Sequence, residues 1–464
     1  MKMKELQQAG IPKPFLQAAH RALVEAARDG MSKPAMKRVV RQLAEHPEAL
    51  VSDLIFGEVA KAIAEYTPEV HDFVPRTEAA PYQQWGADLD EKSIDQMRWA
   101  CALPVSVRGA LMPDAHVGYG LPIGGVLATK DSVIPYAVGV DIACRVKMTV
   151  LDWPVDSLWK REDSLKDALI RETQFGVGAS FKKRREHPVM DEDLSVAPVT
   201  RQLSDKSWAL LGTSGSGNHC VEFGELEITR DDLGLKPGVY LALLSHSGSR
   251  GTGAAVCQEY SKRAMAAHPE LPKELKHLSW LDLASDDGAE YWAAMNLMGE
   301  YASANHACIH REIAKKLSAE VMLDVENHHN FAWKEMHGGE ELIVHRKGAT
   351  PAGAGVLGII PGSMASSCFV VRGLGQPESL NSAAHGAGRV MSRTQARKTL
   401  HWNDAKRMLD ERGVKLLSAG LDEAPAVYKD IHEVMSMQAD LVEPLAEFMP
   451  RLVKMAPAGE RPED

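Results

Sequence analysis

The N-terminal part of the chain places apolar residues at the spacing of amphipathic helices. Leu16, Ala19, Leu23 and Ala26 recur at intervals of three and four residues, and Gly30 follows this run as a stop signal. Such spacing gathers apolar side chains on one stripe of a helix, which must pack against another element to leave water. The pattern therefore predicts a helix that packs within a small bundle.

Two further helices complete the predicted bundle. Ser32 is expected to cap the second helix, with Pro34 in its first turn, where the missing N–H removes no helical hydrogen bond. A third helix is predicted over residues 47–66. Residues 67–88 contain several prolines and are typical of a linker. We therefore expect residues 1–80 to form a helical extension with its linker.

The pattern changes from about residue 91 onward, where short β-forming runs alternate with glycine-rich turns. We expect strands at residues 146–151, 239–244, 341–344 and 368–372, and helices at residues 289–317 and 392–412. The motifs described below are spread from residue 112 to residue 389. One inseparable catalytic domain is therefore expected over residues 81–455, followed by a tail at residues 456–464.

Composition favours a globular protein of the cytoplasm. Of 464 residues, 45% are hydrophobic and 25% are charged. The sequence has no apolar run long enough for a membrane span, and its first residues lack the apolar core of a signal peptide. The six cysteines are scattered without paired spacing, which fits a reducing compartment. We therefore expect no membrane partner.

The net charge of −10 argues against a generic nucleic-acid binder but leaves room for local basic sites. The basic run at residues 182–185 is either a solvated loop or a contact for the RNA backbone. The N-terminal bundle carries a second group of cations, which is either a solvated face or an accessory surface for RNA or a protein. This group consists of Arg21, Arg28, Lys33, Lys37, Arg38 and Arg41.

Five side chains that can bind metal ions lie beside glycines or directly after β-like runs. Asp141 and Cys144 share the sequence GVDIAC, and His219, His246 and His329 lie in GSGNH, HSGSRG and HHN. Glycine lets the backbone approach a ligand closely, and a thiolate can bridge two metal ions. The set can fill two metal sites with positions left open for substrate. Cysteine together with histidine favours zinc, while the carboxylate and the open positions admit manganese or iron.

A second group of residues is suited to phosphate. Cations lie beside glycine and serine turns at Arg250, Arg346, Lys347, Arg389 and Arg393. Arginine binds phosphate through two parallel hydrogen bonds and lysine binds it as a point charge, so phosphate contact is expected. Two metal ions near these cations could clamp the attacking and leaving oxygens of a phosphoryl transfer.

Three residues in this part of the sequence have open roles. His385, in NSAAHGAGR, could be a further metal ligand, a general base or a nucleophile that attacks phosphorus. Asp114 and His116, in PDAH, could orient metal ligands or form a structural turn. Their spacing does not choose between these roles.

Eight motifs, in order along the chain, resemble the RtcB family of RNA-splicing ligases. They are MPDAHVGYGLPIGGV, VGVDIAC, GSGNHCVE, HSGSRG, HHN, HRKGAT, PGSMASS and NSAAHGAGRVMSR, and the resemblance covers roughly residues 90–455. The family joins RNA 3′-phosphate or 2′,3′-cyclic phosphate ends to 5′-hydroxyl ends, using GTP and manganese through a histidine–GMP intermediate. The resemblance implies an α+β fold with central β-sheets flanked by helices around a dinuclear metal cleft.

The resemblance also implies a role for each motif residue. Cys144 would bridge two manganese(II) ions. Asp141 and His219 would complete one site, and His246 and His329 the other. The remaining implied roles are attack on the α-phosphorus of GTP by His385, positioning of phosphate oxygens by Asn218, and binding of the nucleotide by Asn218, Glu222, Ser363, His385, Gly386, Tyr428 and Lys454.

The chain departs from the family pattern at three places. Arg145 follows Cys144 where the family usually has glycine, and Cys368 replaces an expected nucleotide-contacting hydroxyl. Lys454 is followed by Met455 and a further tail instead of ending the chain at a glycine. Because the metal ligands and His385 are all present, catalysis is expected to survive. The departures put the choice of substrate in question.

Two other functions remain open at this stage. A dinuclear metallophosphoesterase acting on cyclic phosphate ends would need the metal ligands but not His385, Tyr428 or Lys454. A non-catalytic protein that binds RNA ends or recruits partners is the other alternative, motivated by the N-terminal helices and the tail. The sequence does not identify the physiological RNA or a protein activator, and a monomer is the default expectation.

Overall fold

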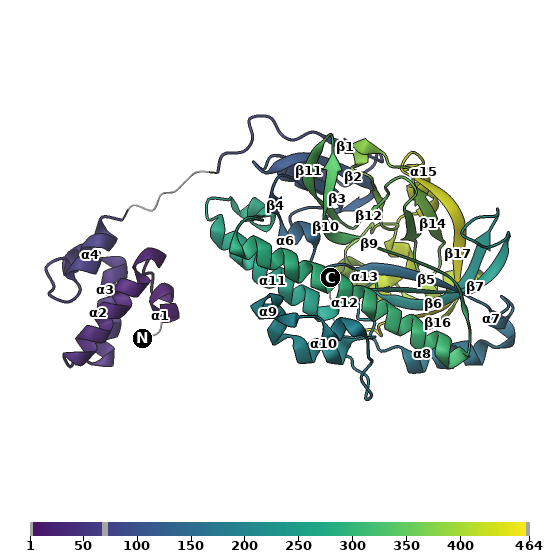
Figure 1. Ribbon diagram of the computed structural model, residues 1–464, viewed down its shortest axis with the longest axis horizontal. Coiled ribbons are helices and arrows are strands. Elements are labelled where there is room, and N and C mark those ends of the chain that lie inside the picture. The colour runs from purple at the N-terminus through teal and green to yellow at the C-terminus, as the bar shows by residue number, and fades with distance from the viewer. Residues whose placement is uncertain (1–2, 67–72, 461–464) are drawn as a thin grey trace. The chain divides into compact units, whose positions relative to one another are not determined.

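The computed structural model describes residues 3–66 and 73–460 (Figure 1). The chain divides into two compact units, Met1–Asp72 and Phe73–Asp464. The first unit has a hydrophobic core of its own, built only from residues 6–63. The first part of the predicted linker, residues 67–72, lies outside the described residues.

The N-terminal unit is helical. Its helices are α1 (Met3–Gln8), α2 (Leu16–Arg28), α3 (Lys33–Glu45) and α4 (Gly57–Ala64). The first two predicted helices are confirmed as α2 and α3, with Ser32 as the N-cap residue of α3, although its side chain makes no capping hydrogen bond. The single helix predicted over residues 47–66 is wrong. The Asp53 carboxylate accepts hydrogen bonds from the backbone N–H groups of Ile55 and Phe56, at 2.9 Å each, and so turns the chain before α4 begins.

The second unit is built on two sheets. The first has the order β1 (Tyr82–Gln84), β2 (Ser106–His116), β3 (Ile123–Thr129), β11 (Glu340–Lys347) and β10 (Asn330–His337). The second has the order β13 (Leu357–Pro361), β14 (Cys368–Gly373), β17 (Val442–Met455), β6 (Cys220–Ile228), β7 (Gly238–Ser247), β5 (Arg145–Leu151) and β9 (Val321–His328). All four predicted strands are confirmed, as β5, β7, β11 and β14. The linker prediction is wrong at β1, because Tyr82 pairs in parallel with Gly109 of β2.

Short strands and helices complete this unit. The short strands are β4 (Ser132–Val133), β8 (Leu281–Asp282), β12 (Ala349–Pro351), β15 (Ser382–Ala384) and β16 (Lys415–Ser418). The helices are α5 (Glu91–Cys101), α6 (Pro135–Val138), α7 (Ser157–Lys160), α8 (Glu162–Glu172), α9 (Pro198–Gln202), α10 (Ser204–Leu210), α11 (Arg250–Ala267), α12 (Asp286–Leu317), α13 (Arg393–Thr399), α14 (Trp402–Glu411) and α15 (Ile431–Ser436). None of the helices in the described part of the chain combines the length and the apolar character that a membrane span needs.

The helix α12 packs on β7 and β5 of the second sheet (Figure 1). Its apolar side includes Ile309 and Ile313, which pack with Leu241 and Leu243 of β7. The predicted helix at residues 289–317 is therefore confirmed. It begins three residues earlier, at Asp286, because the Ser285 hydroxyl caps it by accepting the N–H of Gly288.

The single helix predicted over residues 392–412 is wrong, because it is interrupted between α13 and α14. Leu400 and His401 have extended backbone, with ψ values of 157° and 139°. The break turns Trp402 against an apolar cluster that includes Val453 and Met455. Burial of the indole ring thus outweighs continuation of the helix. Sheets that pair segments far apart in the sequence, with helices segregated around them, confirm the α+β prediction.

Candidate metal centre and nucleotide site

Four of the five predicted metal ligands lie at one end of the second sheet, where four neighbouring strands begin or finish. His219 precedes β6, His246 lies near the end of β7, Cys144 precedes β5, and His329 follows β9. Each of these strands is antiparallel to the next. Because neighbouring strands run in opposite directions, the start of one lies beside the end of the next. Residues separated by almost two hundred positions in the sequence therefore meet.

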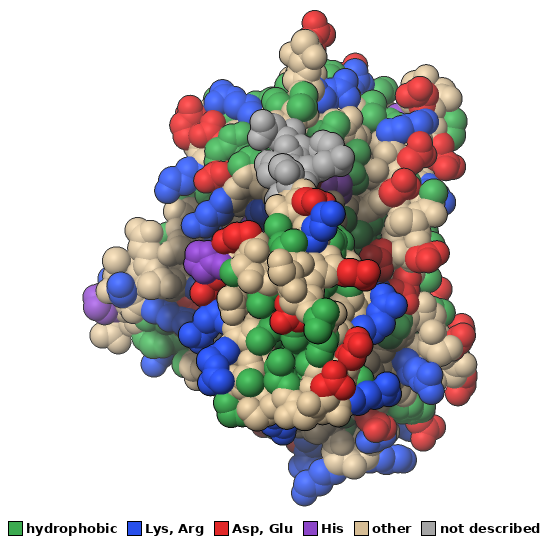
Figure 2. Space-filling model, turned by 90° about the vertical axis from the view of Figure 1, so that its left-hand side faces the viewer, with side chains coloured by type: hydrophobic (Ala, Val, Ile, Leu, Met, Phe, Trp, Pro, Cys, Tyr) green, Lys and Arg blue, Asp and Glu red, His purple; other side chains and the backbone are tan. Residues whose placement is uncertain are grey.

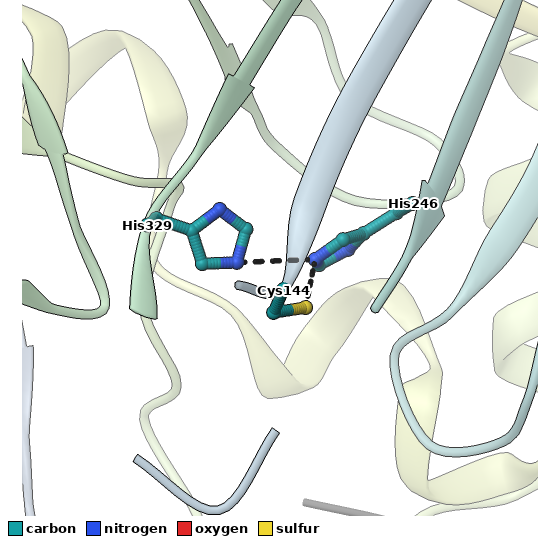
Figure 3. A group of neighbouring side chains, drawn as sticks. All are labelled: Cys144, His246 and His329. Atoms are coloured by element: carbon teal, nitrogen blue, oxygen red, sulfur yellow. Dashed lines mark hydrogen bonds between the residues drawn. The ribbon is translucent and has the colours of Figure 1, made fainter. Parts of the chain in front are cut away.

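The side chains of these residues converge closely enough to bind metal ions. Two groups can each hold an ion, Cys144–His246–His329 and Asp141–Cys144–His219, and Cys144 belongs to both. The Cys144 Sγ lies 3.2 Å from His246 Nε2, which lies 3.3 Å from His329 Nε2 (Figure 3). In the other group, His219 Nε2 lies 3.2 Å from Asp141 Oδ2 and 3.6 Å from Cys144 Sγ. The structure thus brings all five predicted ligands together.

The backbone around the site is shaped to let these side chains approach. Ala143 has a positive φ of 58°, which is unusual for a residue with a Cβ and sets the direction of Cys144. A Cβ on Gly248 would stand 2.1 Å from the Asp141 Oδ2 atom, so the carboxylate occupies space that only glycine leaves open. The N–H of Ser249 donates to the other carboxylate oxygen of Asp141 at 3.2 Å.

Burial favours the neutral imidazole, the form that metal binding requires, at His246 and His329. Burial lowers the pKa of His246 and of His329 well below the usual value, and neighbouring imidazoles add to the effect. The backbone carbonyl of Ser214 lies 2.8 Å from His219 Nδ1, and that of Asn218 accepts from the His246 ring. With a proton on the outer nitrogen, donated to these carbonyls, the Nε2 lone pairs of His219 and His246 face the centre.

This donor set fits metal ions on its chemistry. A thiol, a carboxylate and three neutral imidazoles are all buried, with exposed fractions of 1–6%. Two Nε2 atoms that face each other at 3.3 Å would place two lone pairs in contact unless one nitrogen carries a proton or an ion lies between the ligands. A cation bound by these atoms removes that conflict.

His385 lies next to this centre and is held from behind by Asp114. Its Nδ1 lies 2.7 Å from Asp114 Oδ2, which also accepts from the N–H groups of His385 and Gly386. Asp114 is fully buried in β2, and the His385 ring centroid lies 4.8 Å from that of His329. Because Nδ1–H donates to the carboxylate, Nε2 keeps its lone pair. Of the two roles left open for Asp114, orientation is favoured, but the oriented group is His385.

Three of the predicted nucleotide residues come from neighbouring segments of the second sheet. Glu222 in β6 and Lys454 in β17 lie on paired strands, and Met364, next to Ser363, packs with Val453 and Met455 of β17. Burial raises the pKa of Glu222 to about 8 and lowers that of Lys454 to about 8. The ammonium of Lys454 donates to backbone carbonyls at the C-terminal end of α8, the nearest at 3.0 Å.

The remaining nucleotide candidates lie on the His385 side. The N–H of Gly386 is bonded to Asp114, and Tyr428 contacts Glu423 through its hydroxyl and pairs by backbone with Arg389. Asn218 is half-buried directly before His219 and belongs to neither metal group. The roles of all these residues toward a nucleotide stay predictions.

The cations that the sequence associates with phosphate are bonded to protein acceptors. Arg346 is 1% exposed and donates to both carboxylate oxygens of Glu335, at 2.6 and 3.0 Å. Arg250 donates to the Thr213 hydroxyl and the Gly176 carbonyl. The other three are similarly engaged: Lys347 with the Tyr119 carbonyl, Arg389 with Glu423, and Arg393 with Asp422 and Glu423. Their contact with phosphate also stays a prediction.

A buried hydrogen-bonded network behind β7 was not anticipated from the sequence. The Ser245 hydroxyl lies 2.6 Å from His306 Nδ1 and 2.7 Å from His310 Nε2, both on α12. His310 also lies 2.7 Å from the Thr149 hydroxyl of β5. The network holds β7 and β5 where they deliver His246 and Cys144. The available signal was the spacing of four between the two histidines, which places both on one face of a helix.

Comparison with known proteins is consistent with this geometry. A family model described as tRNA-splicing ligase RtcB matches residues 96–209 and 193–455. The RNA-splicing ligase RtcB1 of Escherichia coli strain ATCC 25922 is 34% identical over 402 residues, which cover 79% of this chain and 95% of the relative. The RNA-splicing ligase RtcB of Escherichia coli K12 matches with the same identity and coverage. The tRNA-splicing ligase RtcB of Thermococcus kodakarensis is 27% identical over 421 residues, which cover 75% of this chain and 87% of the relative.

The family model begins at residue 96, so the helical unit over residues 1–72 lies outside the matched region. The matched region includes every residue of the two metal groups, together with Asp114 and His385. With a family model over more than half of its length and relatives at 34% identity over most of it, this chain belongs to the RtcB family.

Proposed function

We propose that this protein is an RNA ligase that joins RNA 3′-phosphate or 2′,3′-cyclic phosphate ends to 5′-hydroxyl ends. It consumes GTP, depends on manganese, and works through a covalent bond between His385 and GMP. Relatives with 34% identity that are named RNA-splicing ligases support the RNA ligase part of the proposal. The finer chemistry rests on the arrangement around His385.

The observation that carries the proposal is the position of His385 between Asp114 and the metal centre. The carboxylate at 2.7 Å from Nδ1 fixes the ring and leaves the Nε2 lone pair available, and His329 lies on its other side. A neutral imidazole oriented by a buried carboxylate is an activated nucleophile. A metallophosphoesterase would have no use for such a residue, so this pair favours the ligase.

The ions would be held by Asp141, Cys144, His219, His246 and His329, with Cys144 shared between two sites. When bound, manganese would supply positive charge that neutralises and aligns phosphate oxygens. The carboxylate among the ligands and the open positions are compatible with manganese, which prefers oxygen ligands.

In the proposed reaction, His385 Nε2 forms a bond to the α-phosphorus of GTP, and pyrophosphate leaves. An oxygen of the RNA 3′-phosphate then forms a bond to the phosphorus of the GMP group, which releases the His385 imidazole. The 5′-hydroxyl oxygen finally bonds to the RNA phosphorus, its proton is lost, and GMP leaves. A cyclic phosphate end would first be opened by water to a 3′-phosphate. Asp114 would hold the imidazole in place through the first two steps.

The test is covalent labelling of the purified protein with α-labelled GTP and manganese, beside His385→Ala and the exposed-residue control His401→Ala. We expect label in the parent and the control and none in His385→Ala. Ligation of a 3′-phosphate RNA to a 5′-hydroxyl RNA should follow the same pattern. Ligation by His385→Ala would refute the mechanism. An unlabelled parent that binds metal and opens cyclic phosphates would instead favour the phosphoesterase.

A further inference from the structure

A loop that carries three exposed cations begins directly beside the metal-binding motif. Residues 174–176 run alongside residues 214–215, where the N–H of Ser214 donates to Gln174 O at 2.8 Å and that of Gly176 to Gly215 O at 2.7 Å. The Gly215 turn leads into His219 of the metal centre after four residues. This end of the loop is therefore fixed to the same segment that supplies a metal ligand.

The C-terminal tail contacts the same end of the loop. The N–H of Val177 donates to Glu460 Oε2 at 3.3 Å, and a Cβ on Gly176 would stand 2.9 Å from the Glu460 carboxylate carbon. Gly176 has a φ of 103°, which turns the chain outward at this point. Glu460 thus lies against the loop base.

The other end of the loop is fixed by Arg185. Its guanidinium lies 2.7 Å from Glu172 and 3.0 Å from Glu312, and it covers the Phe181 ring at 4.1 Å. The Arg185 stem packs so closely on Gly212 that a Cβ there would stand 2.8 Å from Arg185 Cγ. Gly212 lies three residues before Gly215, so both ends of the loop are joined to the segment before the metal ligand His219.

Between these two ends the chain presents a basic tip made of Lys182, Lys183 and Arg184. All three side chains are exposed. Within the part of the chain that the structure describes, none of them forms an ion pair. The loop is the lowest projecting segment in Figure 1, and Lys and Arg side chains gather at the lower end of the molecule in Figure 2. Arg185, the fourth cation of the run, is used to hold the loop.

We propose that the basic tip binds backbone phosphates of the RNA strand whose end lies in the metal centre. The inference rests on the proposed function, because it assumes an RNA substrate. Three adjacent cations without an apolar anchor among them match a polyanion better than a protein surface, whose binding centres are aromatic or aliphatic. From Gly176, the first cation is six residues along the chain, which an extended backbone spans in at most about 20 Å. The tip therefore lies within about 20 Å of Gly176, which pairs with the segment that leads into the metal ligand His219.

The charge distribution of the chain is the second argument for RNA binding by the tip. Ten Lys and Arg balance ten Asp and Glu in residues 1–72, so the formal charge of −10 resides in residues 73–464. An acidic catalytic unit repels RNA unless cations are concentrated where the strand must pass. The cations nearer the centre, such as Arg346 and Arg389, are neutralised by carboxylates. The exposed tip supplies charge that these residues do not.

The experiment compares the full-length parent with a variant carrying Lys182→Gln, Lys183→Gln and Arg184→Gln. Binding of a fluorescein-labelled single-stranded RNA with a 3′-phosphate is followed by anisotropy between about 50 and 200 mM KCl. The variant should bind about tenfold more weakly at the low-salt end. Its plot of log affinity against log salt should be shallower by about 2, or roughly 0.7 for each lost phosphate contact. Labelling by GTP without RNA should stay within about twofold, because the tip does not contact the nucleotide residues.

A matched control removes the same residue types elsewhere, with Lys33→Gln, Lys37→Gln and Arg38→Gln on α3, which are also exposed. The control should leave affinity and slope unchanged. Equal losses in both variants would overturn the proposal, because the effect would then not be specific to the tip. An unchanged slope in the tip variant would overturn it as well. If the parent binds RNA with the expected slope but takes no label from GTP, the proposed ligase chemistry fails while the RNA contact stands.

Discussion

The two units of this chain bury different kinds of side chain. The core of the N-terminal unit consists of apolar residues such as Leu6, Leu23 and Phe56, and among its described residues no polar side chain is buried. The second unit buries its metal-ligand set, the His306–His310 pair and cations such as Lys147. Burying a polar group costs free energy unless the group is bonded, and burying a charge costs more. The second unit bears this cost at its metal centre and at buried charges such as Lys147 and Lys347 in both sheets.

The difference teaches where to look for function and what substitutions will do there. In the N-terminal unit, core substitutions reduce stability and surface substitutions change little. In the second unit, the buried polar groups have been retained against their cost in stability, which is typical of groups selected for chemistry. Substitutions there should therefore separate activity from stability. The predictions below test that separation, beginning with the largest effect.

The strongest test compares two adjacent histidines, His329 and His328. His329→Ala removes a ligand from the Cys144–His246–His329 group and should lower bound manganese and reduce GTP labelling by at least about 10³-fold, since a bound metal supplies several kcal/mol to phosphoryl transfer. His328 packs on Phe331 and Trp333, with ring centroids 5.0 Å away in each case. His328→Ala should keep the metal but lower the free energy of unfolding by about 1–3 kcal/mol.

Metal analysis after dialysis and urea unfolding of the metal-free proteins would measure both effects. In metal-free protein, His329→Ala should lower the unfolding free energy less than His328→Ala. If both substitutions lower stability equally and neither affects bound manganese, His329 has only a packing role and the comparison between the two units loses its main support.

The next test concerns Asp114. Asp114→Asn keeps the size of the side chain but removes the charge that holds His385 Nδ1–H. We expect labelling by GTP to fall about 10²-fold, because a nucleophile in the wrong orientation or tautomer loses that much. Manganese content should stay the same, since Asp114 belongs to neither metal group. Unchanged labelling would mean that other contacts position His385.

The metal centre and the His385–Asp114 pair differ in how far the sequence could predict them. Each metal ligand lies beside a glycine-rich turn or directly after a β-like run, so the set was accessible from local sequence. Asp114 and His385 are separated by 271 positions and meet only because β2 lies beside the segment after β15. Sequence spacing carries no information on such a contact, so the sequence left the role of Asp114 open and did not indicate His385 as its partner.

The fold shows the same division between local and long-range information. The strands β5, β7, β11 and β14 and the helices α2, α3 and α12 were predictable because period and caps are local signals. The wrong elements were decided by particular contacts. The Asp53 carboxylate turns the chain within a predicted helix, and Trp402 packs on a cluster that is distant in the sequence. Tyr82, inside the predicted linker, pairs with Gly109 of β2. The protein partners of the cations near glycines, such as Glu335 for Arg346 and Glu423 for Arg389, could not be read from local sequence either.

A smaller effect is expected from the buried cation Lys347. Burial lowers the pKa of Lys347 from 10.5 to about 7, while its Nζ donates to the Tyr119 carbonyl. Between pH 7 and the unfolded pKa, the unfolded chain binds the extra proton, so this residue makes stability rise with pH in that window. Below pH 7 the full penalty applies. Lys347→Met should therefore stabilise the protein more at pH 6 than at pH 9, by about 2 kcal/mol.

Urea unfolding of parent and variant at both pH values isolates this contribution, because titrating groups shared by the two proteins cancel in the difference. Lys347→Gln, which is neutral but polar, should show the same pH trend. A stability difference that does not change with pH would show that the Lys347 ammonium keeps its ordinary pKa. It would also mean that burial of Lys347 does not lower the stability of the second unit.

The smallest effect is expected from deleting residues 1–72. All the metal ligands, His385 and the predicted nucleotide residues lie in the second unit, and the apolar cluster over residues 6–63 includes no residue from beyond residue 72. GTP labelling should stay within about twofold, because all the residues of the candidate site lie in the second unit. A labelling rate that falls more than about tenfold would mean that the N-terminal unit contributes to nucleotide capture. In that event the function of this chain would depend on the exposed charges of the N-terminal helices as well as on the buried polar groups of the second unit.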